Sequence, residues 1–261
     1  MIVPRIIPCL LLQGKGLVKG INFKNHRYIG DPINAVKIFS EKEADELLFL
    51  DITASKENRI ISLPFVKKIA DECYMPFGVG GGIQSIEHIR ALLNAGAEKV
   101  SINSAAVTDP EFIREAADIF GSQSILVSID VRKNLFGNYR LYSHCGTKAA
   151  RHDLFAFVKK IENCGAGEIF INSIDKDGTM NGYDLNLVKE ITNIVGIPVI
   201  ACGGAGSLSD ITAVIDDAGA SAAAAGSYFV FHGKKRGILI SYPDKDERET
   251  LARFSADAGV K

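Results

Sequence analysis

Two sets of glycine-rich and polar segments in this sequence could bind phosphate groups. A glycine lets the backbone approach phosphate oxygens closely, and successive backbone N–H groups can then bind them. The first predicted site contains Gly80, Gly81, Gly82, Asn103 and Ser104. The second contains Gly203, Gly204, Gly206, Gly226 and Ser227, framed by Asp177, Gly178 and Thr179. Two such sites would suit a bis-phosphorylated small molecule, whereas the alternative is that these glycines only form tight turns.

The two sets belong to an internal repeat. Pro76–Ile83 resembles Pro198–Ala205, at an offset of 122 residues (198 − 76). Asn94–Ser104 resembles Asp217–Ser227, at an offset of 123 residues (217 − 94). Two matches at nearly the same offset predict that one half of the domain is a duplicate of the other.

One carboxylate breaks this symmetry. Asp130 ends the apolar run that starts at Ser124, and at an offset of 119 residues (130 − 11) its counterpart is Leu11. Ring closure or elimination needs one group to accept a proton and another to donate it. A duplicated half would supply two facing carboxylates for that work, and here one is replaced by an apolar residue. Asp51 is a further carboxylate, which we expect to order the loop after it through hydrogen bonds.

Short apolar runs rich in β-forming residues alternate with amphipathic segments and must position these groups. The predicted strands are Arg5–Leu11, Leu47–Ile52, Phe77–Val79, Lys99–Ile102, Ile125–Asp130, Glu168–Asn172, Pro198–Ala201 and Ala222–Ala225. The predicted helices include Asp31–Glu43, Leu63–Glu72, Ser85–Ala95, Glu111–Phe120, Leu154–Cys164 and Asn186–Val195. Eight β-then-α units in 261 residues predict an α/β protein, a closed (β/α)8 TIM barrel with a two-fold repeat of half-barrels. An open, doubly wound sheet is the alternative.

We expect a single barrel domain over residues 1–261, with half-barrels at about 1–122 and 123–240. Barrels of this kind place their chemistry at the C-terminal ends of the strands, where Asp130 and the glycine-rich segments fall. The remaining segment, 241–261, is charged between Asp244 and Arg253, and we predict a capping helix there without assigning it a function.

Composition excludes several classes of protein. A hydrophobic content of 47% does not fit a disordered chain, and a net charge of −1 does not fit an electrostatic nucleic-acid binder. Five dispersed cysteines without a CxxC pair favour reduced thiols over a disulfide or zinc framework. The apolar run Ile6–Leu12 contains Pro8 and is too short to cross a membrane. We therefore expect a cytoplasmic protein with no metal, cofactor, membrane or nucleic-acid partner.

Long motifs in this chain closely resemble the cyclase subunit of imidazole glycerol phosphate synthase. They include Arg5–Leu10, Val18–Phe23, Leu50–Ser55, Val79–Ile83, Lys99–Ala106, Asp175–Tyr183 and Cys202–Gly206, and they cover nearly the whole chain. The resemblance implies a barrel that takes ammonia from a separate glutaminase subunit, cleaves a bis-phosphorylated ribulosyl intermediate and closes an imidazole ring. It also implies an acid–base pair of aspartates, of which Asp130 matches one and Leu11 stands at the position of the other.

The resemblance implies a charged ring that admits ammonia at the N-terminal face of the barrel, where the glutaminase binds. All four positions match, as Arg5, Glu46, Lys99 and Glu168. Charges inside a barrel are costly unless they pair, so stability alone gives little reason to put them there. The alternative is a solvated charged rim. The resemblance also places Lys19, as a catalytic residue, in a flexible loop that closes over substrate, whereas a plain surface lysine is the alternative.

Several residues depart from the cyclase pattern. Cys145 and Asn172 replace small hydroxyl residues, and Tyr28, in the stretch His26-Arg27-Tyr28, replaces a short acidic residue. With Leu11, these changes resemble the paralogue associated with acetamidino-sugar modification of surface glycans. That resemblance implies that the barrel passes ammonia to a separate sugar amidotransferase. A working cyclase of histidine biosynthesis and a regulatory subunit that binds a phosphorylated metabolite remain the alternatives.

Overall fold

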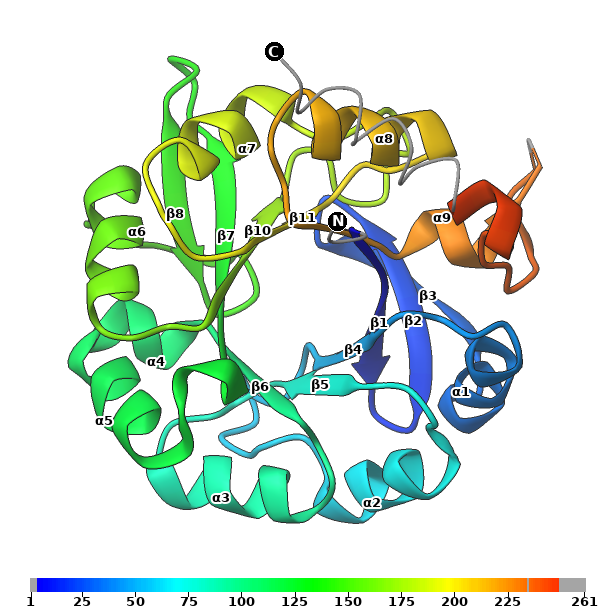
Figure 1. The fold of residues 1–261 in the computed structure, drawn as a ribbon, viewed down its shortest axis with the longest axis horizontal. Helices are drawn as coiled ribbons and strands as arrows, with labels where there is room; N and C mark the ends of the chain where they lie inside the picture. The colour runs from blue at the N-terminus through cyan, green and yellow to red at the C-terminus, as the bar shows by residue number, and fades with distance from the viewer. Residues whose placement is uncertain (1–3, 234, 249–261) are drawn as a thin grey trace.

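A computed structural model of the chain describes residues 4–233 and 235–248. Within these residues, eight parallel strands pair side by side and close into a barrel, since the last strand pairs with the first. In order around the barrel they are β1 (Arg5–Gln13), β4 (Leu47–Asp51), β5 (Phe77–Gly80), β6 (Lys99–Ile102), β7 (Ile125–Lys133), β10 (Glu168–Ser173), β11 (Val199–Cys202) and β12 (Ala222–Ala225) (Figure 1). The predicted TIM barrel is thereby confirmed.

Helices surround the barrel and cover the outer faces of its strands (Figure 1). They are α1 (Pro32–Glu41), α2 (Leu63–Glu72), α3 (Ile86–Asn94), α5 (Glu111–Phe120), α6 (Leu154–Asn163), α7 (Leu185–Thr192) and α8 (Leu208–Asp216). Shorter pieces follow some strands, namely α4 (Ser104–Thr108), the 3-10 turn η1 (Ser122–Ser124) and α9 (Ser227–Val230). In the part of the chain that the structure describes, no helix is long and apolar enough to span a membrane.

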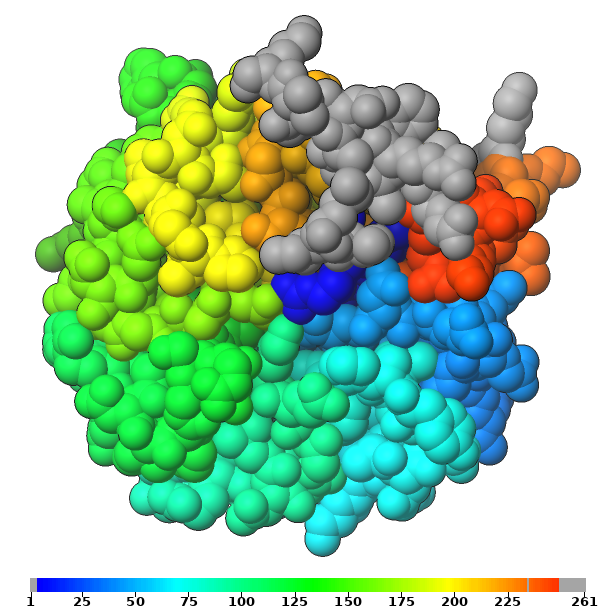
Figure 2. All heavy atoms as spheres, in the orientation of Figure 1, coloured from blue at the N-terminus to red at the C-terminus, as the bar shows by residue number. Residues whose placement is uncertain are grey.

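Side chains alternate between two apolar layers along each strand, because successive residues of a strand point to opposite faces. On β1, Ile6 and Leu10 point outward and pack among the helices, whereas Ile7 and Cys9 point into the barrel. Phe170 of β10 is fully buried in the same interior layer. The open centre of the ribbon in Figure 1 is therefore filled by side chains, and the face drawn in Figure 2 shows no hole through the barrel. We call the end where the strands start the base and the end where they finish the mouth.

Two antiparallel excursions extend the barrel at its mouth. One, β2 (Gly16–Ile21) with β3 (Lys24–Gly30), follows β1, and the other, β8 (Tyr139–Ser143) with β9 (Lys148–Ala149), follows β7. Each excursion continues from a nine-residue strand, longer than the other barrel strands. The sequence analysis predicted neither excursion, although each follows a strand at equivalent places of the two halves.

The eighth outer position is built differently from the other seven. After β12 the chain forms α9 and then a small hairpin, β13 (Phe231–His232) with β14 (Gly237–Ile238). Tyr242 then packs against Phe39 and Phe229, and its hydroxyl donates to Ile6 O at 2.9 Å. Residues 245–248 are helical, residues 241–244 are not, and the part of the predicted capping helix from 249 onward lies outside the described residues.

Candidate functional site: a charged ring at the base and a cavity at the mouth

Four charged side chains meet at the base of the barrel. Arg5 hydrogen-bonds to both Glu46 and Glu168. Lys99 also bridges the two carboxylates, with Nζ 3.2 Å from Glu46 Oε1 and 2.8 Å from Glu168 Oε2. The side chain of Glu46 is only 4% exposed, so its charge needs these partners. The four residues pair with one another rather than forming a solvated rim, and their role in admitting ammonia stays a prediction.

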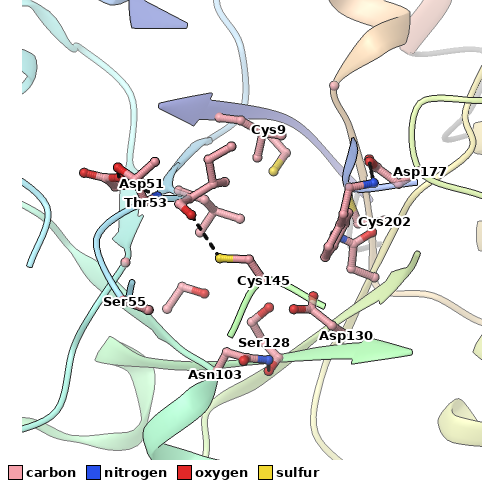
Figure 3. Close-up of a pocket in the computed structure, with 18 of the residues that line it drawn as sticks. Cys9, Asp51, Thr53, Ser55, Asn103, Ser128, Asp130, Cys145, Asp177 and Cys202 are labelled. Carbon is pink, nitrogen blue, oxygen red and sulfur yellow. Dashed lines mark hydrogen bonds between the residues drawn. The ribbon is translucent and has the colours of Figure 1, made fainter. Parts of the chain in front are cut away.

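The mouth contains a cavity of about 210 Å³ into which side chains from both halves point. Most residues predicted for the phosphate sites and for catalysis line this cavity. The exceptions are Gly80, Gly206 and Thr179. The predicted residues in the lining are Leu11, Lys19, Gly81, Gly82, Asn103, Ser104, Asp130, Asp177, Gly178, Gly203, Gly204, Gly226 and Ser227. Figure 3 shows the Asp130 and Ser128 side chains directed toward the middle of this cavity, with Asp177 on another side. The structure therefore brings the predicted residues into one site, whereas their roles stay predictions.

The two glycine-rich loops have the same backbone character in both halves. Gly81 and Gly82 have φ angles of 128° and 71°, and Gly203 and Gly204 have φ angles of 93° and 114°. A Cβ on Gly82 would lie 1.8 Å from the carbonyl oxygen of Arg59, and one on Gly204 would lie 2.1 Å from that of Gly182. Both loops thus require glycine for backbone conformation and for space.

The second parts of the predicted phosphate sites also match. Asn103 precedes α4 with φ −119° and ψ −75°, and Gly226 precedes α9 with φ −115° and ψ −68°. The Asn103 side chain donates to Ser128 O at 2.9 Å, which fixes it against the neighbouring strand. At Gly226 the missing side chain leaves room for Lys19, whose Nζ would be 1.9 Å from a Cβ there. At equivalent positions, the first half therefore has the side-chain amide of Asn103, and the second half has a glycine that makes room for the ammonium group of Lys19.

The segment around Lys19 is a strand and not the irregular loop that the sequence analysis expected, whereas its closure over substrate stays a prediction. Lys19 belongs to β2, is 6% exposed, and its Nζ donates to Cys9 O at 2.5 Å. The strand forms because the chain turns at Gly14 and pairs back on β1, with Leu11 opposite Val18. Lys19 is consequently not a surface residue either, because its side chain lies in the mouth cavity.

The β2–β3 hairpin is tied to the opposite half of the barrel. Asn22, at the hairpin turn, donates its backbone N–H to Asp177 O at 2.9 Å and its side-chain amide to Ile174 O at 2.9 Å. Phe23 N donates to the Asp177 carboxylate at 3.4 Å. These bonds join the turn to the loop after β10, so the hairpin crosses part of the mouth.

Asp130 is a buried carboxylate without a donor among the described residues. It is 7% exposed, and neither a hydrogen bond nor an ion pair to its carboxylate is found within the described residues. Burial, and then the nearby charge of Asp177, raise the pKa of Asp130 to about 7. Burial also raises the pKa of Asp177, which the Lys19 charge opposes. Asp130 can therefore exchange a proton near neutral pH, as a general acid or base must.

The strand register explains how Leu11 and Asp130 occupy equivalent positions. Leu11 lies opposite Val18 of its excursion and Leu50 of the next parallel strand. Asp130 lies opposite Tyr142 of its excursion and Asn172 of the next parallel strand. One half therefore presents a pair of leucines at the mouth, and the other presents an aspartate and an asparagine.

Asp51 has a structural task, as expected. Its Oδ1 accepts hydrogen bonds from the backbone N–H groups of Thr53 and Ala54, at 3.0 and 3.1 Å, and Arg59 pairs with its Oδ2. These bonds order the loop after β4. Cys145, a departure from the cyclase pattern, points its thiol at Ile52 O at 3.1 Å, and burial raises the pKa of that thiol to about 11.

The sequence analysis missed two hydroxyl groups that line the cavity, those of Ser101 and Ser128. Ser101 follows Lys99 by two residues on β6, and Ser128 precedes Asp130 by two on β7. The two-residue period of a strand puts each pair on the same, inner face. That spacing was a signal in the sequence that could have found them. No group of three or more His, Cys, Asp or Glu residues among those described is placed to hold a metal ion.

Comparisons with known proteins give this architecture a family. The family model described as "Histidine biosynthesis protein" matches residues 5–235. A Pseudomonas aeruginosa chain named "Putative imidazole glycerol phosphate synthase subunit hisF2" is 50% identical over 244 residues, which are 94% of this chain and 97% of that one. The Leptospira interrogans "Putative imidazole glycerol phosphate synthase subunit HisF" is 45% identical over 252 residues, 96% of this chain and 99% of its own.

A third relative carries the name without qualification. The "Imidazole glycerol phosphate synthase subunit HisF" of Prochlorococcus marinus is 48% identical over 237 residues, 90% of this chain and 92% of its own. The family model extends over both half-barrels and includes the base ring and the mouth cavity. This protein therefore belongs to the histidine biosynthesis protein family, among chains similar to the HisF subunit of imidazole glycerol phosphate synthase.

Proposed function

We propose that this protein is a cytoplasmic barrel subunit that receives ammonia from a glutaminase at its base and passes it to a separate sugar amidotransferase. The product of that partner would be an acetamidino sugar of a surface glycan. The observation that carries the proposal is the combination of Leu11, in place of one acid–base group, with the complete ring of Arg5, Glu46, Lys99 and Glu168 at the base.

The mouth favours this function over ring closure. General acid–base catalysis contributes about 10²–10⁴-fold to a rate, so a cyclase without one of its two carboxylates would be a poor enzyme. Leu11 is packed beside Leu50, which is also apolar, so no neighbour on that strand replaces the missing group. Asp130 is the acid–base residue that remains, and the glycine-rich loops would hold a phosphorylated small molecule.

The base favours ammonia passage over a purely regulatory role. A ring of two cations and two carboxylates in a barrel is costly to bury, and its geometry fits a gate that opens when one pair separates. The names of the relatives describe them as subunits, which supports a partner at this face. A regulatory subunit that only binds a metabolite would not need the ring.

Growth without histidine separates the proposal from its main alternative, the cyclase of histidine biosynthesis. We would express this chain in a bacterium that lacks its own cyclase subunit and plate the cells on medium without histidine, with a functional cyclase subunit as positive control. We expect no growth, because the barrel has one acid–base group. Robust growth would show that the chain closes the imidazole ring and would overturn the proposal.

Ammonia transfer tests the gate. With the glutaminase and acceptor enzyme present, the yield of aminated product per glutamine hydrolysed is measured for the wild type, Lys99→Ala and Glu46→Ala. We expect this yield to fall in both variants, because each breaks the ring, while product formation from added ammonium salt is retained. Lys37→Ala, which breaks the surface pair of Lys37 with Glu72, is the matched control. Equal yields in all four proteins would contradict a gate at the base.

A further inference from the structure

Several oxygen acceptors near the mouth end of the lumen have no donor. The Asp130 carboxylate accepts no hydrogen bond from a described residue. Asn172 Oδ1 and Ser101 Oγ are buried and have no hydrogen-bond partner in the part of the chain that the structure describes. A buried acceptor without a donor costs about 1–3 kcal/mol, more when it is charged. All three residues line the same cavity. Asp130 and Asn172 are also neighbours in the register of β7 and β10, so one small N–H donor could satisfy these two together.

These acceptors lie along one side of the barrel interior. Lys99 and Ser101 of β6 are two residues apart, as are Ser128 and Asp130 of β7, so all four side chains point into the barrel. The opposite side, formed by β1 and β4, carries Ile7, Cys9, Leu11, Leu48 and Leu50. Polar side chains of β6 and β7 thus lead from the charged ring toward Asp130 and Asn172, beside the apolar Leu126 and Phe170 of β7 and β10. The apolar wall of β1 and β4 lies across the lumen.

We propose that Asp130 and Asn172 form a binding site for ammonium, which holds ammonia at the mouth until the acceptor takes it. The inference rests on the proposed function, because ammonia has to reach the mouth through the barrel. Asp130 and Asn172 are direct neighbours in the register of β7 and β10. Leu11 and Leu50, at the equivalent positions of the other half, have no acceptor to offer, so the site is single and lies to one side of the mouth.

Neither lysine in the lining of the cavity, Lys19 or Lys56, forms an ion pair with Asp130 among the described residues. Lys19 Nζ is bound to Cys9 O and lies against Gly226, and it makes no ion pair with Asp130 among the described residues. Its charge acts on Asp177 instead. The Asp130 carboxylate consequently stays available for a cation that arrives through the lumen.

The proton balance of the step closes without a further reactant. Ammonia is a stronger base than a carboxylate whose pKa is about 7, so the protonated Asp130 gives its proton to the nitrogen, and an ammonium–carboxylate pair forms. Asn172 Oδ1 accepts a hydrogen bond from one N–H group of the ammonium ion. On release, the proton returns to Asp130 and neutral ammonia, the nucleophilic form, leaves for the acceptor.

A titration of the full-length chain tests the site directly. The carboxyl carbon of Asp130, in protein labelled with carbon-13 at aspartate, is followed by NMR against pH in ammonium chloride and in sodium chloride of equal concentration. We expect the midpoint to be lower in ammonium chloride, because bound ammonium stabilises the carboxylate. The ammonium concentration that gives half of this shift should rise about tenfold to hundredfold in Asn172→Leu, which loses one hydrogen bond to a charged group.

Asn163→Leu, at an exposed position on α6, is the matched control and should behave as the wild type. Identical midpoints in the two salts for the wild type would overturn the inference, and so would an unchanged ammonium effect in Asn172→Leu. Should Asn172→Leu fail to fold, thallium(I), a heavy cation similar in size to ammonium, is soaked into wild-type crystals. An anomalous peak between Asp130 and Asn172 supports the site, and its absence there contradicts it.

The inference and the proposed function can fail separately. Gate-dependent transfer of ammonia by a chain that binds no ammonium would leave the channelling function intact and remove the holding site. Ammonium binding at Asp130 in a chain that supports growth without histidine would keep the site and replace channelling by ring closure.

Discussion

The two halves of this barrel share a backbone design and differ at one pair of positions. Their glycine-rich loops have positive φ angles at equivalent residues, and Asn103 and Gly226 have nearly the same φ and ψ angles. At the mouth, however, one half presents Leu11 beside Leu50, and the other presents Asp130 beside Asn172. Both halves therefore have the same loop backbone, whereas only the second half has a group at this position that can exchange a proton.

This difference separates what holds the site from what acts in it. The loops depend on steric limits that are the same in both halves, because a carbonyl oxygen fills the place of any side chain. The inner positions carry no such limit, since a leucine and an aspartate fit on the same strand face. Chemistry at the mouth can thus change through single side chains without disturbing the fold.

The largest expected effect tests the part that the halves share. Gly82→Ala and Gly204→Ala should each destabilise the protein by about 2–4 kcal/mol, because both strain a left-handed backbone and push a Cβ into a carbonyl oxygen. Denaturant unfolding measures the loss. Gly14→Ala, also at positive φ but with open space around it, should cost clearly less. A large loss of stability in one of the two variants with no loss in the other would show that the two loops do not share the same steric limit.

The next effect tests the position where the halves differ, through pH. The folded-state pKa of Asp130 is about 7, above its usual range, so its contribution to stability is complete below about pH 4 and is lost as the pH rises to about 7. The free energy of unfolding of Asp130→Asn relative to the wild type should therefore rise with pH in that window, by at most about 1.4 kcal/mol per unit.

Leu11→Asn is the matched variant for this pH series. It should destabilise the protein by a constant amount over the same window, because Leu11 does not titrate. The other charged groups that line the cavity, Lys19, Asp51, Lys56 and Asp177, are unchanged in both variants. A pH-independent difference between Asp130→Asn and the wild type would show that Asp130 is ionised in the folded state throughout.

Restoring the second carboxylate should sharpen the contrast. Leu11→Asp places an acid in a largely apolar surrounding beside Leu50, and we expect a loss of about 1–3 kcal/mol in stability at neutral pH. Because a second negative charge would face the same cavity, the pKa of Asp130 should rise above about 7. NMR titration of the carboxyl carbons measures it. A lower pKa of Asp130 in this variant would contradict the facing arrangement.

The smallest expected effect concerns Asp177, whose charge is the second-largest cause of the raised pKa of Asp130, after burial. Asp177→Asn removes a negative charge, so the pKa of Asp130 should fall, by less than about one unit because burial is the larger cause. The same titration measures the shift. A fall to the usual range of an aspartate would mean that the neighbouring charge, and not burial, controls Asp130.

The sequence by itself determined the architecture and most members of the site. Eight apolar runs and the repeat offset predicted the closed barrel, because strand side chains alternate and the C-terminal ends of parallel strands meet at one mouth. The same reasoning placed Asp130 opposite a missing partner at Leu11. The four charges at the base came from the resemblance to the cyclase subunit, and not from the strand pattern.

Only the tertiary structure decided how the site is closed and which groups lack partners. Lys19 is buried because β2 folds back on β1 and the hairpin turn bonds to the loop after β10, contacts between segments far apart in the sequence. The pairing of Asp130 with Asn172, and the absence of a donor for either acceptor within the described residues, depend on the register of two strands. Local patterns determine which face a side chain takes, whereas its partners depend on how distant segments pack.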